Sequence, residues 1–305
     1  MNAPARRWTG KSRGPLWGHL FFYYATRVTG LWFAYFSLFF PVAYYVLTMH
    51  DARQASFHYL DRVLGKAPWW KRWARTYWHF FQYSRTALDA LVLGARGTGA
   101  FSLIHDGIEN LRDAARTGNG VIFLTAHVGS WTVAARLIDE LTGAKFAVTA
   151  LEADEAKMQE FFRNAHGEAP RVISIGADPL SSIELIHALR DGYAVALQGD
   201  RSVGPRVVRV PFLGSMAEFP AGPFLIASLA RVPIVVTFAA QSGWRKYHFT
   251  GFPPFDVKLD RSFPMEPQLE EAVKKYVARL EDAVRKHPYQ FFNFFEFWPE
   301  DVKAG

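Results

Sequence analysis

The chain has 305 residues, of which 50% are hydrophobic and 21% charged, and its formal net charge at pH 7 is +7. This length and apolar content suit one large α/β domain with an added segment, and they exclude a disordered chain. The sequence contains no cysteine, which excludes disulfides and cysteine nucleophiles and suits a cytosolic face.

Positive charge is concentrated in the N-terminal part of the chain, where five basic residues precede the first acidic residue, Asp51. Such charge favours an anionic partner, either a membrane surface or a nucleic acid. Because the surrounding sequence is too apolar for a solvated basic arm, we expect a lipid bilayer and no nucleic acid.

An uncharged, aromatic stretch from Val28 to Met49 is long enough to cross a hydrocarbon core of about 30 Å. It lacks a small-residue cleavage site, so the pattern does not indicate a removable signal peptide. Pro41 near its middle fits a kinked or interfacial segment as well as a straight span. The basic residues at both ends favour a dipping or monotopic membrane anchor. The alternative is a buried helix hairpin that covers the globular core.

The next segment, Trp69 to Phe81, has the pattern of a helix with one aromatic stripe, formed by Trp70, Trp73, Tyr77 and Phe81. Its basic residues lie off that stripe, as in a helix at a bilayer interface, although packing against the globular domain is equally compatible with the pattern. We therefore divide the chain into an N-terminal membrane-anchoring helical segment, residues 1–85, and a globular domain, residues 86–305.

Apolar, β-branched runs alternate with helical patterns from about Ile108 onward. The alternation predicts an α/β fold with a mostly parallel central sheet flanked by helices. The expected strands are 121–126, 146–150, 172–175, 193–197 and 234–238, with 247–252 as a later addition, and the expected helices include 131–141, 183–190 and 269–284.

His127 directly follows the first of these strands and precedes a helix that Ser130 is placed to cap. It should therefore stand at the carboxyl end of a parallel strand, where open α/β sheets bind ligands. The position suits a general base, and a structural histidine is the alternative.

The sequence around His127 resembles the lipid A late acyltransferase type of the lysophospholipid acyltransferase superfamily, whose signature is His-x4-Asp/Glu. The resemblance continues in order and spacing over roughly residues 15 to 298. The segments that carry it are Leu180-Ser-Ser-Ile-Glu-Leu-Ile-His-Ala-Leu-Arg-Asp-Gly192, Val195-Ala-Leu-Gln-Gly-Asp-Arg201, Val210-Pro-Phe-Leu-Gly214, Phe219-Pro-Ala-Gly-Pro-Phe-Leu-Ile-Ala227 and Pro288-Tyr-Gln-Phe-Phe-Asn293.

The resemblance implies a glycerolipid acyltransferase-like fold and direct transfer of a fatty acyl group from a thioester on acyl carrier protein or coenzyme A. His127 would deprotonate the hydroxyl or amine of a membrane lipid or lipid-like acceptor. It further implies no metal and no cofactor beyond the acyl thioester co-substrate. The expected location is the cytoplasmic face of the bacterial inner membrane.

The chain departs from the family at the acidic position of the signature, which is Thr132. A threonine can accept a hydrogen bond from the histidine but cannot stabilise an imidazolium by charge. Glu152 and Asp200 each follow an expected strand and are the candidate substitutes, and the sequence does not choose between them. A catalytically inactive relative that binds lipid or acyl carrier protein is the alternative.

Basic residues near Asp200 are candidates for substrate binding. Arg201 resembles part of the family's second signature and could organise the acceptor or bind phosphates of the donor. Arg206 and Arg209 extend the positive patch, or are solvated loop charges, and Ser130 is the remaining candidate beside His127.

Overall fold

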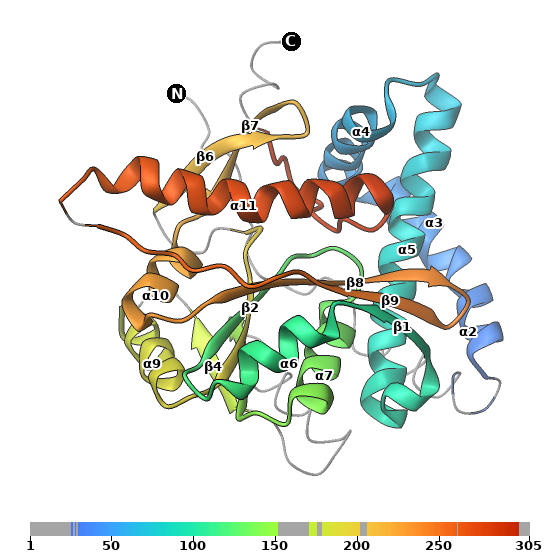
Figure 1. Ribbon diagram of the computed structural model, residues 1–305. Coiled ribbons are helices and arrows are strands. Elements are labelled where there is room, and N and C mark those ends of the chain that lie inside the picture. The colour runs from blue at the N-terminus through green and yellow to red at the C-terminus, as the bar shows by residue number, and fades with distance from the viewer. Residues whose placement is uncertain are drawn as a thin grey trace.

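The computed structural model describes residues 26, 28, 30–151, 171–175, 179–201, 206–260 and 262–298. A seven-stranded sheet with the strand order β1-β9-β8-β2-β5-β3-β4 forms its centre (Figure 1). All neighbouring strands pair in parallel except β8 and β9, which form an antiparallel hairpin. The strands are β1 (Ser102–Asp106), β2 (Val121–Thr125), β3 (Phe146–Leu151), β4 (Arg171–Ile175), β5 (Ala194–Gln198), β8 (Ile234–Gly243) and β9 (Lys246–Gly251).

Helices cover both faces of the sheet, which confirms the predicted α/β class. The two faces follow from the alternation of side chains along each strand. In β2, Val121 and Phe123 pack on α6 (Ile108–Arg116) and α7 (Trp131–Thr142). Ile122 and Leu124 pack on the opposite layer, formed by α9 (Pro179–Arg190), α10 (Gly222–Ala230) and α11 (Met265–Lys286).

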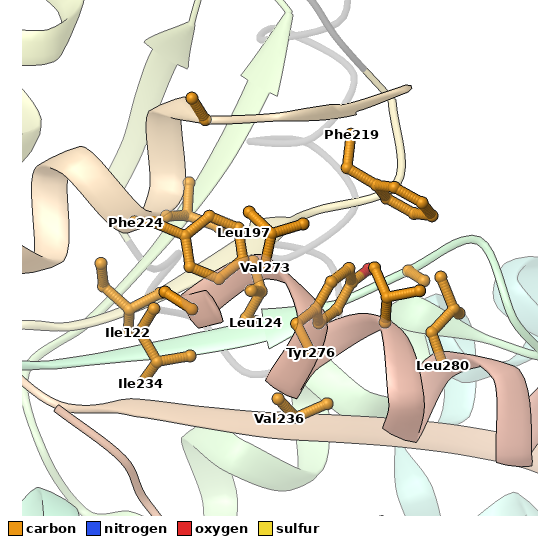
Figure 2. Close-up of a cluster of buried hydrophobic side chains, with 14 of the residues drawn as sticks. Ile122, Leu124, Leu197, Phe219, Phe224, Ile234, Val236, Val273, Tyr276 and Leu280 are labelled. Atoms are coloured by element: carbon orange, nitrogen blue, oxygen red, sulfur yellow. The ribbon is translucent and has the colours of Figure 1, made fainter. Parts of the chain in front are cut away.

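Helix α11 supplies much of this second layer. Val273, Tyr276 and Leu280 lie on one side of α11 and point toward the apolar side chains of β2, β5 and β8 (Figure 2). The Tyr276 hydroxyl is buried with them and donates to the Thr125 carbonyl at 3.1 Å. Thr125, the last residue of β2, is therefore hydrogen-bonded to α11, and His127 follows it two residues later.

The uncharged N-terminal stretch forms two helices, α2 (Gly30–Ser37) and α3 (Phe39–Thr48), which are separated at Leu38. Pro41 lies in the first turn of α3, where its missing N–H breaks no helical hydrogen bond. Val42 and Val46 on the inner side of α3 are buried in a cluster with Phe80 and Phe81 of α5 (Trp69–Arg96). Helix α4 (His50–Leu64) connects the two.

The aromatic stripe predicted for α5 is partly buried and partly exposed. Phe81 is buried, Tyr77 and Phe81 contact Phe39 of α3, and Trp70 near the helix start is exposed. The C-terminal half of the stripe therefore packs against α3. Helix α5 runs without a break through residue 85, and the division of the chain at that point stays a prediction.

A buried carboxylate joins these helices to the sheet. Asp89 of α5 accepts hydrogen bonds from the hydroxyls of Tyr35 on α2 and Tyr247 on β9, and from the Gln241 amide on β8. The Tyr247 and Gln241 contacts are both 2.6 Å long. Because a buried carboxylate is stable only when its acceptors are occupied, this cluster holds α2 against the β8–β9 hairpin.

Three strands were not anticipated from the sequence. Strand β1 lies at the edge of the sheet after a short 3-10 turn, η1 (Thr98–Ala100), and most of its side chains are exposed, so it lacks the apolar run of a central strand. Strands β6 (Val207–Phe212) and β7 (Ser215–Pro220) form a separate antiparallel hairpin against α11 (Figure 1). It contains the Val210 to Gly214 segment.

Candidate active site

The fold places His127 in a tight turn between β2 and α7. All five residues of β2 are buried, whereas the His127 side chain is 16% exposed. Gly129 has φ +62°, and a Cβ built on it would lie 2.1 Å from the Ala239 carbonyl oxygen, so the turn requires glycine. The Ser130 hydroxyl accepts from the Val133 N–H at 3.3 Å and caps α7, as the sequence predicted.

The acidic partner of His127 is Asp200, which follows β5. Its carboxylate accepts from His127 Nδ1, with distances of 2.9 Å to Oδ1 and 3.1 Å to Oδ2. The backbone N–H of His127 donates to Oδ2 at 3.1 Å, and Asn293 Nδ2 donates to the same oxygen at 2.8 Å. The Asp200 side chain is fully buried, so protein donors rather than water stabilise its charge.

Thr132, at the acidic position of the signature, points elsewhere. Its hydroxyl lies 2.9 Å from Ser130 Oγ, and both side chains are buried in the first turn of α7. Glu152, the other candidate substitute, lies outside the described residues. Of the two substitutes proposed from the sequence, Asp200 is the one found against His127.

Electrostatics favour an ionised Asp200 beside a neutral His127. Burial raises the pKa of Asp200, but His127, Arg201 and the Asn293 hydrogen bond outweigh it and bring that pKa to about 2. Burial and the charge of Arg201 lower the pKa of His127, and Asp200 opposes them only in part. An ionised carboxylate can only accept, so Nδ1 carries the proton and Nε2 carries the lone pair that can take one.

Arg201 lies beside the pair and is held by the C-terminal segment. Its Nε donates to Asn293 Oδ1 at 2.6 Å and its Nη2 to the Phe292 carbonyl at 2.7 Å. The guanidinium also lies 5.8 Å from the centre of the Phe295 ring. These contacts fix a positive charge next to the His127–Asp200 pair.

The remaining candidates are less closely connected to this pair. Arg206 is exposed, and Arg209 on β6 forms an ion pair with Glu218 at 3.3 Å. The Ser130 hydroxyl is occupied in capping α7, and its contact with substrate stays a prediction. Within the described part of the chain, no group of three or more histidine and acidic residues is arranged to hold a metal ion.

Sequence reasoning missed Asn293. The segment Pro288 to Asn293 contributed to the resemblance, but nothing in its local pattern assigned a role to that side chain. The amide contacts both Asp200 and Arg201, which lie more than 90 residues earlier in the chain. Contacts at such a separation have no signature in local spacing.

The His127–Asp200 pair lies at the carboxyl edge of the sheet, where open α/β sheets bind ligands, and a neutral histidine there has the chemistry to accept a proton. The family described as bacterial lipid A biosynthesis acyltransferase matches residues 93–299, a range that includes His127, Asp200 and Asn293. The chain belongs to this family and is an acyltransferase of lipid biosynthesis.

Among solved structures, the chain is similar to the 1-acyl-sn-glycerophosphate (LPA) acyltransferase PlsC from Thermotoga maritima. The identity is 17%, the TM-score is 0.33, and the match covers 80% of this chain and 95% of that chain. No curated protein matches this chain.

Proposed function

We propose that the protein transfers a fatty acyl group from an acyl carrier protein or coenzyme A thioester to a hydroxyl or amine of a membrane lipid or lipid-like acceptor. The His127–Asp200 pair is the observation that carries this proposal, because it provides a neutral imidazole with an oriented lone pair. The acyl thioester is a co-substrate, and the reaction uses neither a metal nor a resident cofactor.

In the proposed reaction, His127 Nε2 takes the acceptor's proton as the acceptor oxygen or nitrogen attacks the thioester carbonyl carbon. Asp200 stabilises the resulting imidazolium through its bond to Nδ1. Collapse of the tetrahedral intermediate breaks the C–S bond, and the imidazolium returns its proton to the departing thiolate. Arg201 contributes a positive charge for the developing oxyanion or for phosphate groups of a substrate.

The alternative of an inactive binding protein arose from Thr132. Its motivation was the loss of a charged partner for His127, and the contacts of Asp200 supply one. The acyltransferase reading is therefore favoured over the inactive one.

We further propose that the protein lies on the cytoplasmic face of the bacterial inner membrane. Among the described residues, Gly30–Thr48 is the one helical stretch of sufficient length and apolarity to cross a membrane, and 28% of it is buried against the rest of the protein. A stripe of large apolar side chains on its outer side is 60% to 74% exposed, comprising Trp32, Phe36, Phe40, Tyr44 and Leu47. Because the inner side of α3 packs on α5, these contacts favour a helix lying in the interface over a full span.

The function can be tested with the full-length protein in detergent or lipid nanodiscs. Radiolabelled acyl carrier protein or acyl-coenzyme A is incubated with total bacterial membrane lipid, and labelled lipid is separated and identified. We expect transfer by the wild type and none by His127→Ala, whereas His187→Ala, an exposed histidine on α9, retains it. Equal turnover in His127→Ala and wild type would refute the general-base mechanism.

A further inference from the structure

The side chain of Asn293 lies between two opposite charges that are neighbours in the sequence. Its Nδ2 donates to Asp200 Oδ2 at 2.8 Å, and its Oδ1 accepts from Arg201 Nε at 2.6 Å. Because a carboxylate only accepts and a guanidinium only donates, these two partners determine the orientation of the amide. The Asn293 residue is 4% exposed, so water does not compete for either bond.

The carboxylate oxygen that Asn293 contacts also binds His127. Oδ2 receives the His127 backbone N–H and the Asn293 amide, while both oxygens lie within 3.1 Å of His127 Nδ1. A direct ion pair with Arg201 would be a strong competitor for the same oxygens, since guanidinium and carboxylate form charge-assisted bonds. Such a pair would draw the carboxylate away from His127.

The backbone around Asn293 is attached to the same turn that carries His127. Phe292 N–H donates to the His127 carbonyl at 2.7 Å, and Gly129 N–H donates to the Gln290 carbonyl at 2.8 Å. From the other side, buried His79 of α5 lies with Nε2 2.9 Å from the Phe291 carbonyl oxygen. Asn293 is consequently held in register with His127 by backbone bonds rather than by its own side chain.

We propose that Asn293 is a positioning residue, which keeps the Asp200 carboxylate directed at His127 by binding Asp200 through one end of its amide and Arg201 through the other. It holds the Arg201 guanidinium at the edge of the site and away from the carboxylate. The consequence for catalysis rests on the proposed role of His127 as general base, whereas the consequence for the His127 tautomer does not.

The tautomer of His127 can be read by ¹⁵N NMR of the full-length protein labelled at histidine, with the His127 signals assigned by their loss in His127→Ala. The wild type should show Nδ1 protonated and Nε2 unprotonated. In Asn293→Ala, Arg201 turns to Asp200 and the two nitrogen shifts move toward each other as both tautomers become populated. We expect kcat to fall by about tenfold to a hundredfold, with KM within about twofold of wild type.

Two further variants separate this role from a simple packing defect. Asn293→Leu occupies similar volume without polar groups and should give the same change in tautomer as Asn293→Ala. Asn293→Ala combined with Arg201→Met removes the competing cation and should restore the Nδ1-protonated tautomer. Asn110→Ala, which removes a distant side-chain bond to the Gly251 carbonyl, should leave the tautomer and kcat as in wild type.

An unchanged His127 tautomer in Asn293→Ala and Asn293→Leu would overturn the proposal, whatever the activity. Failure of the Arg201→Met combination to restore the tautomer would also overturn it, because competition by Arg201 is its physical basis. Failure of the proposed function would appear separately, as full turnover by His127→Ala.

Discussion

Replacing Asp200 with asparagine tests the central pair of the site with little change in shape. The carboxylate accepts three donors, which are His127 Nδ1, the His127 backbone N–H and Asn293 Nδ2. An amide nitrogen in place of Oδ2 would face two of these donors. The less costly orientation puts the amide nitrogen at Oδ1, where it donates to His127 Nδ1 and forces the proton onto Nε2.

With its proton on Nε2, His127 lacks the lone pair that takes the acceptor's proton in the proposed reaction. Loss of the charged partner in a comparable histidine–aspartate pair costs about 10⁴ in kcat, which corresponds to about 5 kcal/mol. We expect a decrease of that order for Asp200→Asn in acyl transfer to membrane lipid, with KM little changed because the pair acts in the transition state. Asp282→Asn, at the exposed Lys286 ion pair of 2.8 Å, is the matched control. A decrease of less than tenfold in Asp200→Asn would refute the assignment of Asp200 as the partner of His127.

The other predictions concern pH, the signature position and the membrane surface. Folding lowers the pKa of Asp200 from 3.8 to about 2. About 2 kcal/mol of stability is therefore present above pH 4 and lost as the pH falls toward 2. Melting curves across that range should show this loss in the wild type and not in Asp200→Asn. Thr132→Glu should not raise turnover and should lower stability by about 1 to 3 kcal/mol, because it buries a second carboxylate. A tenfold gain in turnover would mean that Asp200 does not supply the negative charge beside His127. The combined change Phe36→Ser, Phe40→Ser and Leu47→Ser should weaken flotation with anionic lipid vesicles at unchanged melting temperature, because these side chains are exposed. Ile183→Ser on α9 should not weaken it. Equal flotation of the triple variant and the wild type would contradict the proposed contact of α2 and α3 with the membrane.

The position of His127 could be predicted because its determinants are local. A buried strand is recognisable as a short apolar run, and a serine followed by a helical pattern marks the first turn of the next helix. Both signals lie within about ten residues of His127, and the structure contains β2 and the Ser130 cap where they were expected. The α/β class followed for the same reason, since the central parallel strands carry their own apolar signal.

The identity of the acid depended on strand order, which no local pattern encodes. Asp200 follows β5 and Glu152 follows β3, so each stands after a strand of suitable character. In the sheet, β5 pairs directly with β2, whereas β3 lies one strand further out. Only the tertiary arrangement therefore brings Asp200 to His127.

The same distinction applies to the two ends of the chain. Composition alone indicated an apolar N-terminal segment. Which side of α3 is buried and which is exposed depends on its packing against α5. At the other end, Gln290 to Asn293 has no periodicity and forms no regular element, so its sequence carries no signal of position. Its place beside His127 and Asp200 results from backbone bonds between segments more than 150 residues apart. Long-range pairing of this kind is a property of the folded chain as a whole.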